Sequence, residues 1–98
     1  MTIAVTLELR IKAGQGAEFA VGLKGMLGDT RARQGAEFIE MIVDQNDADH
    51  IIVYERWATK EDHQAYMAWR QERGDLDGLG KACAEPPAVT YFDIGDPG

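Results

Sequence analysis

A predicted hairpin near the middle of the chain constrains the fold more than any other feature. Two runs rich in β-branched and aromatic residues, Glu37–Asp44 and His50–Trp57, flank a polar segment of turn-forming residues. Side chains alternate between the two faces of a strand, so Phe38 and Ile42 lie opposite to Ile39. Both faces of the hairpin are therefore apolar, and a stable fold must cover both.

The remaining elements complete a recognisable order. Thr2–Lys12 alternates strictly between apolar and polar residues, which predicts a strand. Helical spacing predicts a helix over Phe19–Arg33, a second over Thr59–Arg73 with Thr59 as its N-cap, and a shorter one over Asp75–Ala84. A last strand is expected over Ala88–Ile94. This order, strand, helix, strand, strand, helix, strand, predicts an α+β ferredoxin-like fold with a four-stranded antiparallel sheet.

Length and composition predict one globular domain over residues 1–98. A chain of 98 residues has room for one hydrophobic core, and two independent cores are excluded. Its 45% hydrophobic and 28% charged residues are ordinary values for a folded protein, which excludes intrinsic disorder and fibrous repeats.

The charge balance predicts which partners the protein avoids. Seventeen acidic and ten basic residues give a formal net charge of -7, which would repel phosphate backbones and anionic lipids. We expect neither a nucleic acid nor a membrane as partner. The single Cys83 cannot form an intramolecular disulfide and is expected to be a small buried thiol. No charged-then-apolar leader precedes Thr2, so a cytoplasmic location is expected.

The apolar second face of the sheet predicts a partner. Two helices can cover only one face of a four-stranded antiparallel sheet. The second face is most simply covered by another copy of the chain, packed sheet to sheet in a two-fold homodimer. The alternative is that strand propensity alone explains the additional apolar residues, since single exposed ones are common.

Familiar catalytic motifs are missing from the sequence. His50 and His63 are thirteen residues apart with no cysteine near either, so we expect no metal site. The chain contains no serine and no glycine-rich phosphate loop after a strand, so serine hydrolysis and ATP chemistry are not expected.

The second long helix carries the most informative side chains. Asp62, Tyr66, Trp69 and Arg73 are spaced four, three and four residues apart, which aligns them on one helical face. If this face is turned toward the sheet, it would line a small-molecule cavity with an apolar wall and a few polar groups. Alternatively, the two aromatic residues belong to the core and the two charged ones form a solvent-facing pair. His63 lies one step off this face, either as a surface residue or as a general base.

The strand end Tyr54-Glu55-Arg56-Trp57, followed by the Thr59 cap and the helix through Tyr66, resembles the antibiotic biosynthesis monooxygenase family. The turn at Gly14, the helix end at Gly35 and the last strand after Pro86-Pro87 extend this resemblance over nearly the whole chain. The family consists of dimeric α+β barrel proteins, including quinol and anthrone monooxygenases and haem-degrading relatives. In this resemblance the pair of Glu55 and Trp57 looks like a marker of the fold more than a catalytic device.

The resemblance implies a chemistry that needs no cofactor. Members that oxidise quinols or anthrones work without metal or flavin, because the electron-rich substrate anion itself reacts with dioxygen. The protein would bind, deprotonate and desolvate the substrate. Tyr66 stands where many members have a histidine, and Leu7 and Leu76 stand at positions that haem-degrading members use, so haem degradation is not expected.

We therefore expect a cofactor-independent monooxygenase acting with dioxygen on a phenolic, quinol or anthrone-like aromatic substrate. The alternatives are a non-catalytic small-molecule-binding protein and an isomerase, cyclase or dehalogenase-like enzyme on the same fold. The expected catalytic residues are Tyr66 as hydrogen-bond donor to the substrate oxygen, Arg73 as stabiliser of negative charge and His63 as reserve base. The expected substrate-binding residues are Trp57 and Trp69 as aromatic walls, with Asp62 and Tyr54.

Overall fold

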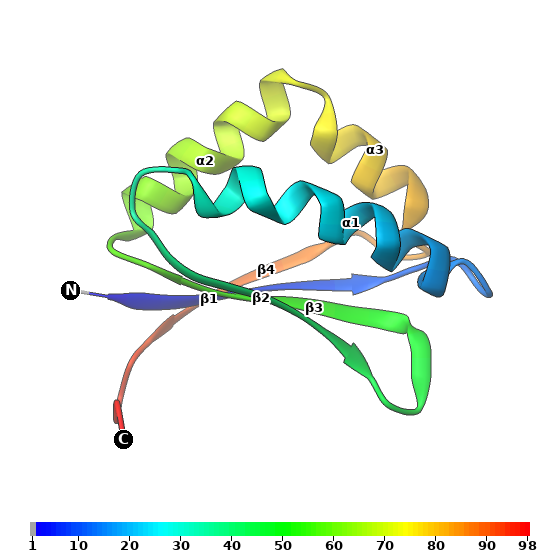
Figure 1. Ribbon diagram of the computed structural model, residues 1–98, viewed down its shortest axis with the longest axis horizontal. Helices are drawn as coiled ribbons and strands as arrows, with labels where there is room; N and C mark the ends of the chain where they lie inside the picture. The colour runs from blue at the N-terminus through cyan, green and yellow to red at the C-terminus, as the bar shows by residue number, and fades with distance from the viewer. Residues whose placement is uncertain (1) are drawn as a thin grey trace.

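The computed structural model describes residues 2–98 and shows a four-stranded antiparallel sheet with all helices on one face (Figure 1). The strands are ordered β2-β3-β1-β4 across the sheet. This arrangement confirms the predicted ferredoxin-like α+β fold. The elements along the chain are β1 (Ile3–Arg10), α1 (Gly16–Arg31), β2 (Ala36–Asp44), β3 (Asp47–Trp57), α2 (Lys60–Glu72), α3 (Asp75–Ala82) and β4 (Ala88–Asp93).

The hairpin between β2 and β3 is tighter than the sequence predicts. The Asp44 side chain accepts a hydrogen bond from the Asn46 backbone N–H at 2.8 Å, which closes the turn over two residues. The strand pairing therefore resumes at Asp47, three residues before the predicted start of β3. Asp49 accepts hydrogen bonds from the backbone N–H groups of Gly14 and Gly16, at 2.9 and 2.8 Å. The start of α1 is thereby fixed to the start of β3.

Glycines are required at the start of α1 and in the turn that follows it. A Cβ atom on Gly16 would overlap the backbone of Ala48, so the helix and the hairpin can approach this closely only with glycine. The helix ends at Arg31, two residues earlier than predicted, because the Arg33 N–H bonds to the Thr30 carbonyl in a tighter turn. The C-cap is Ala32, so Gly35 does not cap the helix as predicted but lies in the turn before β2. Its backbone is left-handed at φ 86°, and a Cβ there would also overlap the Asp62 side chain.

The core lies between the sheet and the helices. Val5, Leu9, Ile51 and Trp57 are buried on the inner face of the central strands, as the alternation predicts. Cys83 is buried as predicted, and burial raises the pKa of its thiol. No helix within residues 2–98 has the length and apolarity needed to cross a membrane.

The outer face of the sheet carries exposed apolar side chains, as the sequence predicts, beside a polar group formed by Glu8, Asp44 and His50. Phe38, Ile42 and Phe92 are 45%, 44% and 48% exposed there. Strand register places Phe38 of β2 and Phe92 of β4 at opposite edges of the sheet, with Arg56 of β3 and the buried Ala4 of β1 between them, so exposed apolar side chains lie at both edges of this face. The helices leave this face uncovered (Figure 1).

Candidate functional site

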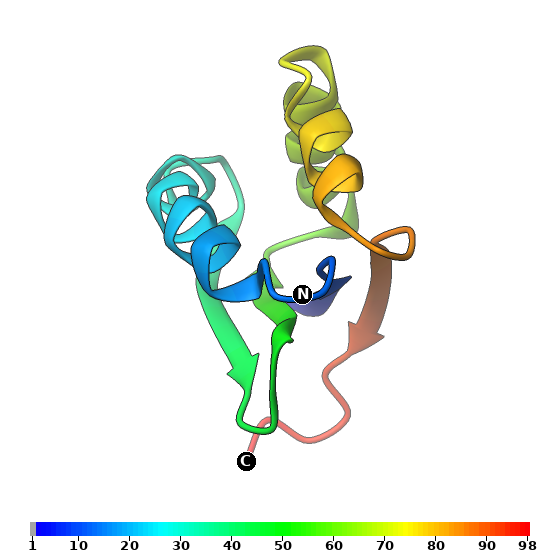
Figure 2. The same cartoon turned by 90° about the vertical axis from the view of Figure 1, so that its right-hand side faces the viewer.

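A cavity of about 640 Å³ lies between the sheet and the helices. Figure 2 shows α1 on one side and α2 with α3 on the other, both standing above the sheet. The volume lies within the range of ligand-binding sites for small organic molecules. Gln15 and Glu18 line the cavity and are exposed, so it opens to solvent at the start of α1. Its apolar wall includes Phe19, Leu23, Met26, Leu27, Met67 and Leu79.

Arg70 organises one polar cluster in the cavity and is only 3% exposed. Its Nε donates to the Tyr66 hydroxyl oxygen at 3.1 Å, and its Nη1 donates to Asp75 at 2.9 Å. Its Nη2 donates to the Met26 carbonyl and to the Thr30 hydroxyl, at 2.9 and 3.1 Å. These bonds tie α2 to α1 and α3. Asp75 balances the guanidinium charge, and the hydrogen bond from Arg70 holds the pKa of Asp75 below its usual value.

The Tyr66 hydroxyl is placed to donate a hydrogen bond to an oxygen atom of a ligand in the cavity. It lies 2.9 Å from the Thr30 hydroxyl, and either group can be the donor. When Thr30 donates, the Tyr66 oxygen accepts two hydrogen bonds, one from Thr30 and one from Arg70. The Tyr66 proton is then free for a ligand in the cavity.

Glu55 and His63 form the second polar cluster. Glu55 is 3% exposed, and its Oε1 accepts a hydrogen bond from the Trp57 indole Nε1 at 2.8 Å. The same oxygen lies 3.8 Å from Nε2 of His63. The other ring nitrogen, Nδ1, lies 2.8 Å from the Tyr91 hydroxyl. A chain of polar groups thus extends from β4 through α2 to β3.

Burial shifts the ionisation of these two groups in opposite ways. Burial raises the pKa of Glu55 to about 7, although the hydrogen bond from Trp57 acts in the other direction. Burial lowers the pKa of His63 to about 4. At neutral pH the imidazole is therefore neutral and about half of the Glu55 side chains are ionised. When Tyr91 donates to Nδ1, the ring proton lies on Nε2 and faces Glu55.

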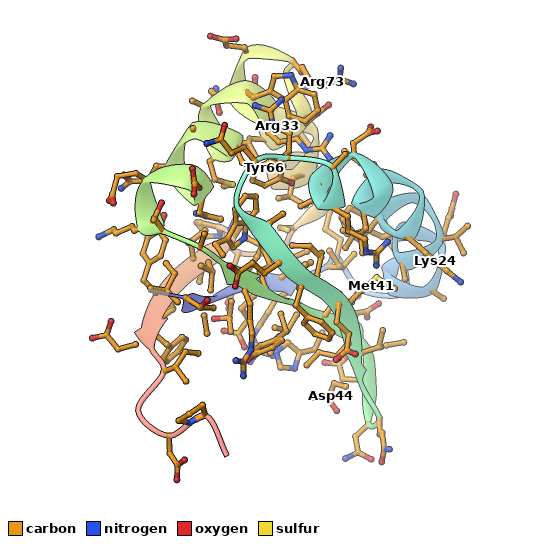
Figure 3. The ribbon with its side chains drawn as sticks, turned by 60° about the vertical axis from the view of Figure 1, so that its left-hand side comes forward. Lys24, Arg33, Met41, Asp44, Tyr66 and Arg73 are labelled. Atoms are coloured by element: carbon orange, nitrogen blue, oxygen red, sulfur yellow. The ribbon has the colours of Figure 1, made fainter. Side chains whose placement is uncertain are left out.

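Tyr66 and His63 line the cavity, but the other five residues of the predicted set do not, namely Tyr54, Trp57, Asp62, Trp69 and Arg73. The Arg73 side chain is 51% exposed and donates to Asp75 at 3.0 Å. The Trp69 ring is surrounded by the guanidinium groups of Arg33, Arg70 and Arg73, each within 5 Å of its centre. Figure 3 shows Arg33 and Arg73 together at the end of α2, beyond Tyr66.

Trp57, Tyr54 and Asp62, which were expected to bind substrate, lie instead in the core, on the outer face of the sheet and at the start of α2. Trp57 is fully buried in the core and directs its N–H to Glu55. Tyr54 lies on the outer face of β3, where its hydroxyl accepts a hydrogen bond from Arg56 at 3.0 Å. Asp62 lies at the start of α2, where its backbone N–H donates to the Thr59 side chain, which confirms the predicted N-cap.

Sequence reasoning missed the two buried charged side chains that line the cavity, Arg70 and Glu55. A signal for Arg70 exists, since it follows Tyr66 by four residues and His63 by seven, on one helical face. Glu55 interrupts an apolar alternation between Val53 and Trp57, and an acidic residue on the buried face of a strand is unusual.

These groups limit what the cavity can bind. Within residues 2–98 no three His, Cys, Asp or Glu side chains are grouped closely enough to hold a metal ion. Away from its opening at Gln15 and Glu18, the cavity offers hydroxyl groups, a charge-balanced guanidinium, a carboxyl group and a neutral imidazole on a mostly apolar wall. Such a set suits an uncharged aromatic molecule with a few oxygen atoms.

Solved structures share this fold at low sequence identity. Rv0793 from Mycobacterium tuberculosis superposes with a TM-score of 0.84 at 17% identity, over 98% of this chain and 97% of that chain. A conserved protein from Methanosarcina mazei gives 0.83 at 12% identity, over 95% and 92%. A Deinococcus radiodurans protein assigned by name to the antibiotic biosynthesis monooxygenases gives 0.80 at 19%, over 98% and 94%.

A comparison with curated proteins finds no match. A comparison with protein families does: the sequence from residue 2 to residue 72 matches that of the antibiotic biosynthesis monooxygenases. The match covers β1 to α2 and includes Glu55, His63, Tyr66 and Arg70. The chain therefore belongs to the antibiotic biosynthesis monooxygenase family.

Proposed function

We propose that the protein is a cofactor-independent monooxygenase that oxidises a phenolic, quinol or anthrone-like aromatic substrate with dioxygen. The observation that carries this proposal is the cavity, whose apolar wall holds a hydrogen-bond donor, Tyr66, and a buried carboxyl group, Glu55. Membership of a family named for monooxygenases supports the same class of reaction.

The reaction divides into two parts with different needs. The substrate first loses a proton, and the resulting electron-rich anion then transfers electrons to dioxygen. One oxygen atom enters the organic product as a carbonyl group, and the other leaves as water with the two hydrogens that the substrate loses. The substrate supplies all the electrons, so the protein has to bind it, help remove the proton and keep bulk water out.

Tyr66 and Arg70 fit the task of holding the anion. The Tyr66 hydroxyl donates to the substrate oxygen on which negative charge develops, and Arg70 polarises that hydroxyl by donating to its oxygen at 3.1 Å. Arg70 takes the part expected of Arg73, because Arg73 lies outside the cavity. His63 is a weak base here because burial lowers its pKa to about 4.

Oxygen uptake with a panel of quinols and anthrones tests the proposed function. We expect one dioxygen consumed per substrate oxidised. Removal of one hydrogen-bond donor to a developing oxyanion typically lowers kcat by about 100-fold or more, and we expect this of Tyr66→Phe. Tyr54→Phe is the matched control, since Tyr54 lies on the opposite face of the sheet. Equal rates in the wild type and Tyr66→Phe would remove Tyr66 from the mechanism.

An isomerase is a second candidate, which the buried carboxyl of Glu55 favours, because proton transfer alone needs no dioxygen. Turnover of substrate to a rearranged product that persists under argon would establish the isomerase instead. A ligand-induced rise in melting temperature without any product would favour a binding protein.

The proposed assembly is a homodimer in which the outer faces of two sheets pack together. Phe38, Ile42 and Phe92 are almost half exposed on that face, and burial of such residues favours association. Sedimentation is expected to give about twice the 10.8 kDa mass of one chain, and Ile42→Glu is expected to dissociate the particle. A stable 10.8 kDa particle of the wild type at micromolar concentration would contradict the dimer.

A further inference from the structure

Glu55 is the only acidic side chain within residues 2–98 that is buried. Among the described residues it has no lysine or arginine partner, because the one basic side chain within 4 Å of it there is the neutral His63. Burial of a carboxyl group without a cation is costly. Glu55 lines the cavity, and buried ionisable groups in cavities are often functional.

The two oxygens of Glu55 have different surroundings. Oε1 accepts the hydrogen bond from Trp57 and faces His63. Oε2 forms no hydrogen bond with residues 2–98. Every side-chain nitrogen or oxygen of these residues that is fully buried does have a hydrogen-bond partner, so Oε2 is not fully buried. Because Glu55 lines the cavity, we take the accessible surface of Oε2 to face the cavity. One oxygen is held in place while the other is available to a ligand.

The neighbours of Glu55 lie on the adjacent strands β1 and β2, on α2 and on β4. Across the sheet its register partners are apolar, Val5 of β1 and Ile39 of β2. The titratable groups that face it are His63 of α2 and, beyond that ring, Tyr91 of β4. The other charged groups of the cavity are Arg70 and Asp75, which are joined at 2.9 Å and neutralise each other, and the exposed Glu18 at the opening to solvent.

We propose that Glu55 is the proton acceptor of the site and that its Oε2 atom removes a proton from an acidic C–H or O–H group of the bound substrate. For a carbon acid, the C–H bond breaks, its electron pair stays on the substrate as an enolate, and the proton forms an O–H bond with Oε2. Trp57 and His63 are positioning residues that hold the carboxyl group at Oε1. This inference rests on the proposed function for its substrate class.

The ionisation of Glu55 suits this role. A rise of its pKa from 4.5 to about 7 makes its carboxylate about 300-fold stronger as a base, while about half remains ionised at pH 7. The same burial makes His63 a weaker base, with a pKa of about 4. Of the two groups in this cluster, the carboxylate is the one that can accept a proton at neutral pH.

Hydrogen exchange without dioxygen tests the proton transfer separately from oxidation. Anthrone is dissolved in deuterated buffer under argon, and loss of its acidic C–H signal is followed by nuclear magnetic resonance. We expect the wild type to catalyse this exchange, with a rate that rises with pH and levels off above about 7. Glu55→Gln is expected to lower the rate at least about 100-fold. The exposed Glu72→Gln, outside the cavity, is the matched control.

A second variant keeps the test decisive if Glu55→Gln folds poorly. Trp57→Phe removes the hydrogen bond that lowers the pKa of Glu55, so the midpoint of the pH profile is expected to move above 7. A midpoint that stays in place would overturn the assignment. So would exchange in the wild type no faster than in buffer, or full exchange in folded Glu55→Gln.

The outcomes distinguish this inference from the proposed function. Exchange that depends on Glu55, without oxygen uptake on any substrate, would overturn the monooxygenase and support the proton acceptor. Oxygen uptake that is unchanged in Glu55→Gln would support the monooxygenase and overturn the proton acceptor.

Discussion

Glu55 and His63 are expected to give the folding stability opposite dependences on pH. Burial raises the pKa of Glu55 from 4.5 to about 7, so the folded protein binds its proton more tightly than the unfolded chain. Its contribution to stability is therefore largest below pH 4.5 and is lost as the pH rises to 7. Burial lowers the pKa of His63 from 6.5 to about 4, so its contribution is complete above pH 6.5 and is lost as the pH falls to 4.

The magnitudes of the two effects are nearly equal. With these pKa values, linkage gives a change of about 2 kcal/mol for each group between pH 4.5 and 6.5, with opposite signs. In the wild type the two changes cancel. Asp44, Asp75 and His50 also have shifted pKa values, but their contributions are common to the wild type and to variants of the cavity.

Single substitutions are expected to separate the two titrations. In Glu55→Gln only His63 remains, so the free energy of unfolding should rise by about 2 kcal/mol relative to wild type from pH 4.5 to 6.5. In His63→Gln only Glu55 remains, so the free energy of unfolding should fall by about 2 kcal/mol relative to wild type over the same pH range. Urea unfolding followed by circular dichroism across this range measures both slopes. Parallel curves for the wild type and both variants would refute the reasoning.

Other substitutions test the packing that supports the site. Gly25→Ala, at an open helical position, should raise the free energy of unfolding by about 0.5–1 kcal/mol in urea titrations. Gly35→Ala should lower the melting temperature, because φ is 86° and the new Cβ would overlap Asp62. Arg70→Met should cost about 3 kcal/mol or more by leaving buried acceptors unpaired. The half-exposed Arg73→Met should cost less than about 1 kcal/mol, and equal losses would contradict the burial of Arg70.

Alternation along the strands carried most of the fold prediction. The period of two in Thr2–Lys12 and in the hairpin is a local property, and it remains true in the sheet because each strand has one face against the helices. The two-residue turn at Asp44 was harder to predict, because the run from Gln45 to Asp49 contains polar residues that suit either a long loop or the end of a strand.

The inward face of α2 was difficult to predict because it is not apolar. Its fully buried side chains are His63 and Arg70, whereas hydrophobic periodicity is a guide only where apolar residues are buried. Arg70 is stable inside because its acceptors come from α1 and α3, as the carbonyl of Met26 and the carboxylate of Asp75. The spacing of Arg70 from His63 and Tyr66 places the three on one face of the helix, but the acceptors on α1 and α3 that make this face the buried one are distant in the sequence.

The position of a bound aromatic ligand tests the account most directly. A crystal structure of the protein with anthraquinone, the product expected from anthrone, is predicted to show the ligand in the cavity between α1 and α2. One carbonyl oxygen should lie within hydrogen-bond distance of the Tyr66 hydroxyl. The opposite carbonyl group, formed at the carbon from which anthrone loses its proton, should lie beside Oε2 of Glu55. A ligand bound on the outer face of the sheet, with the cavity empty, would contradict the account.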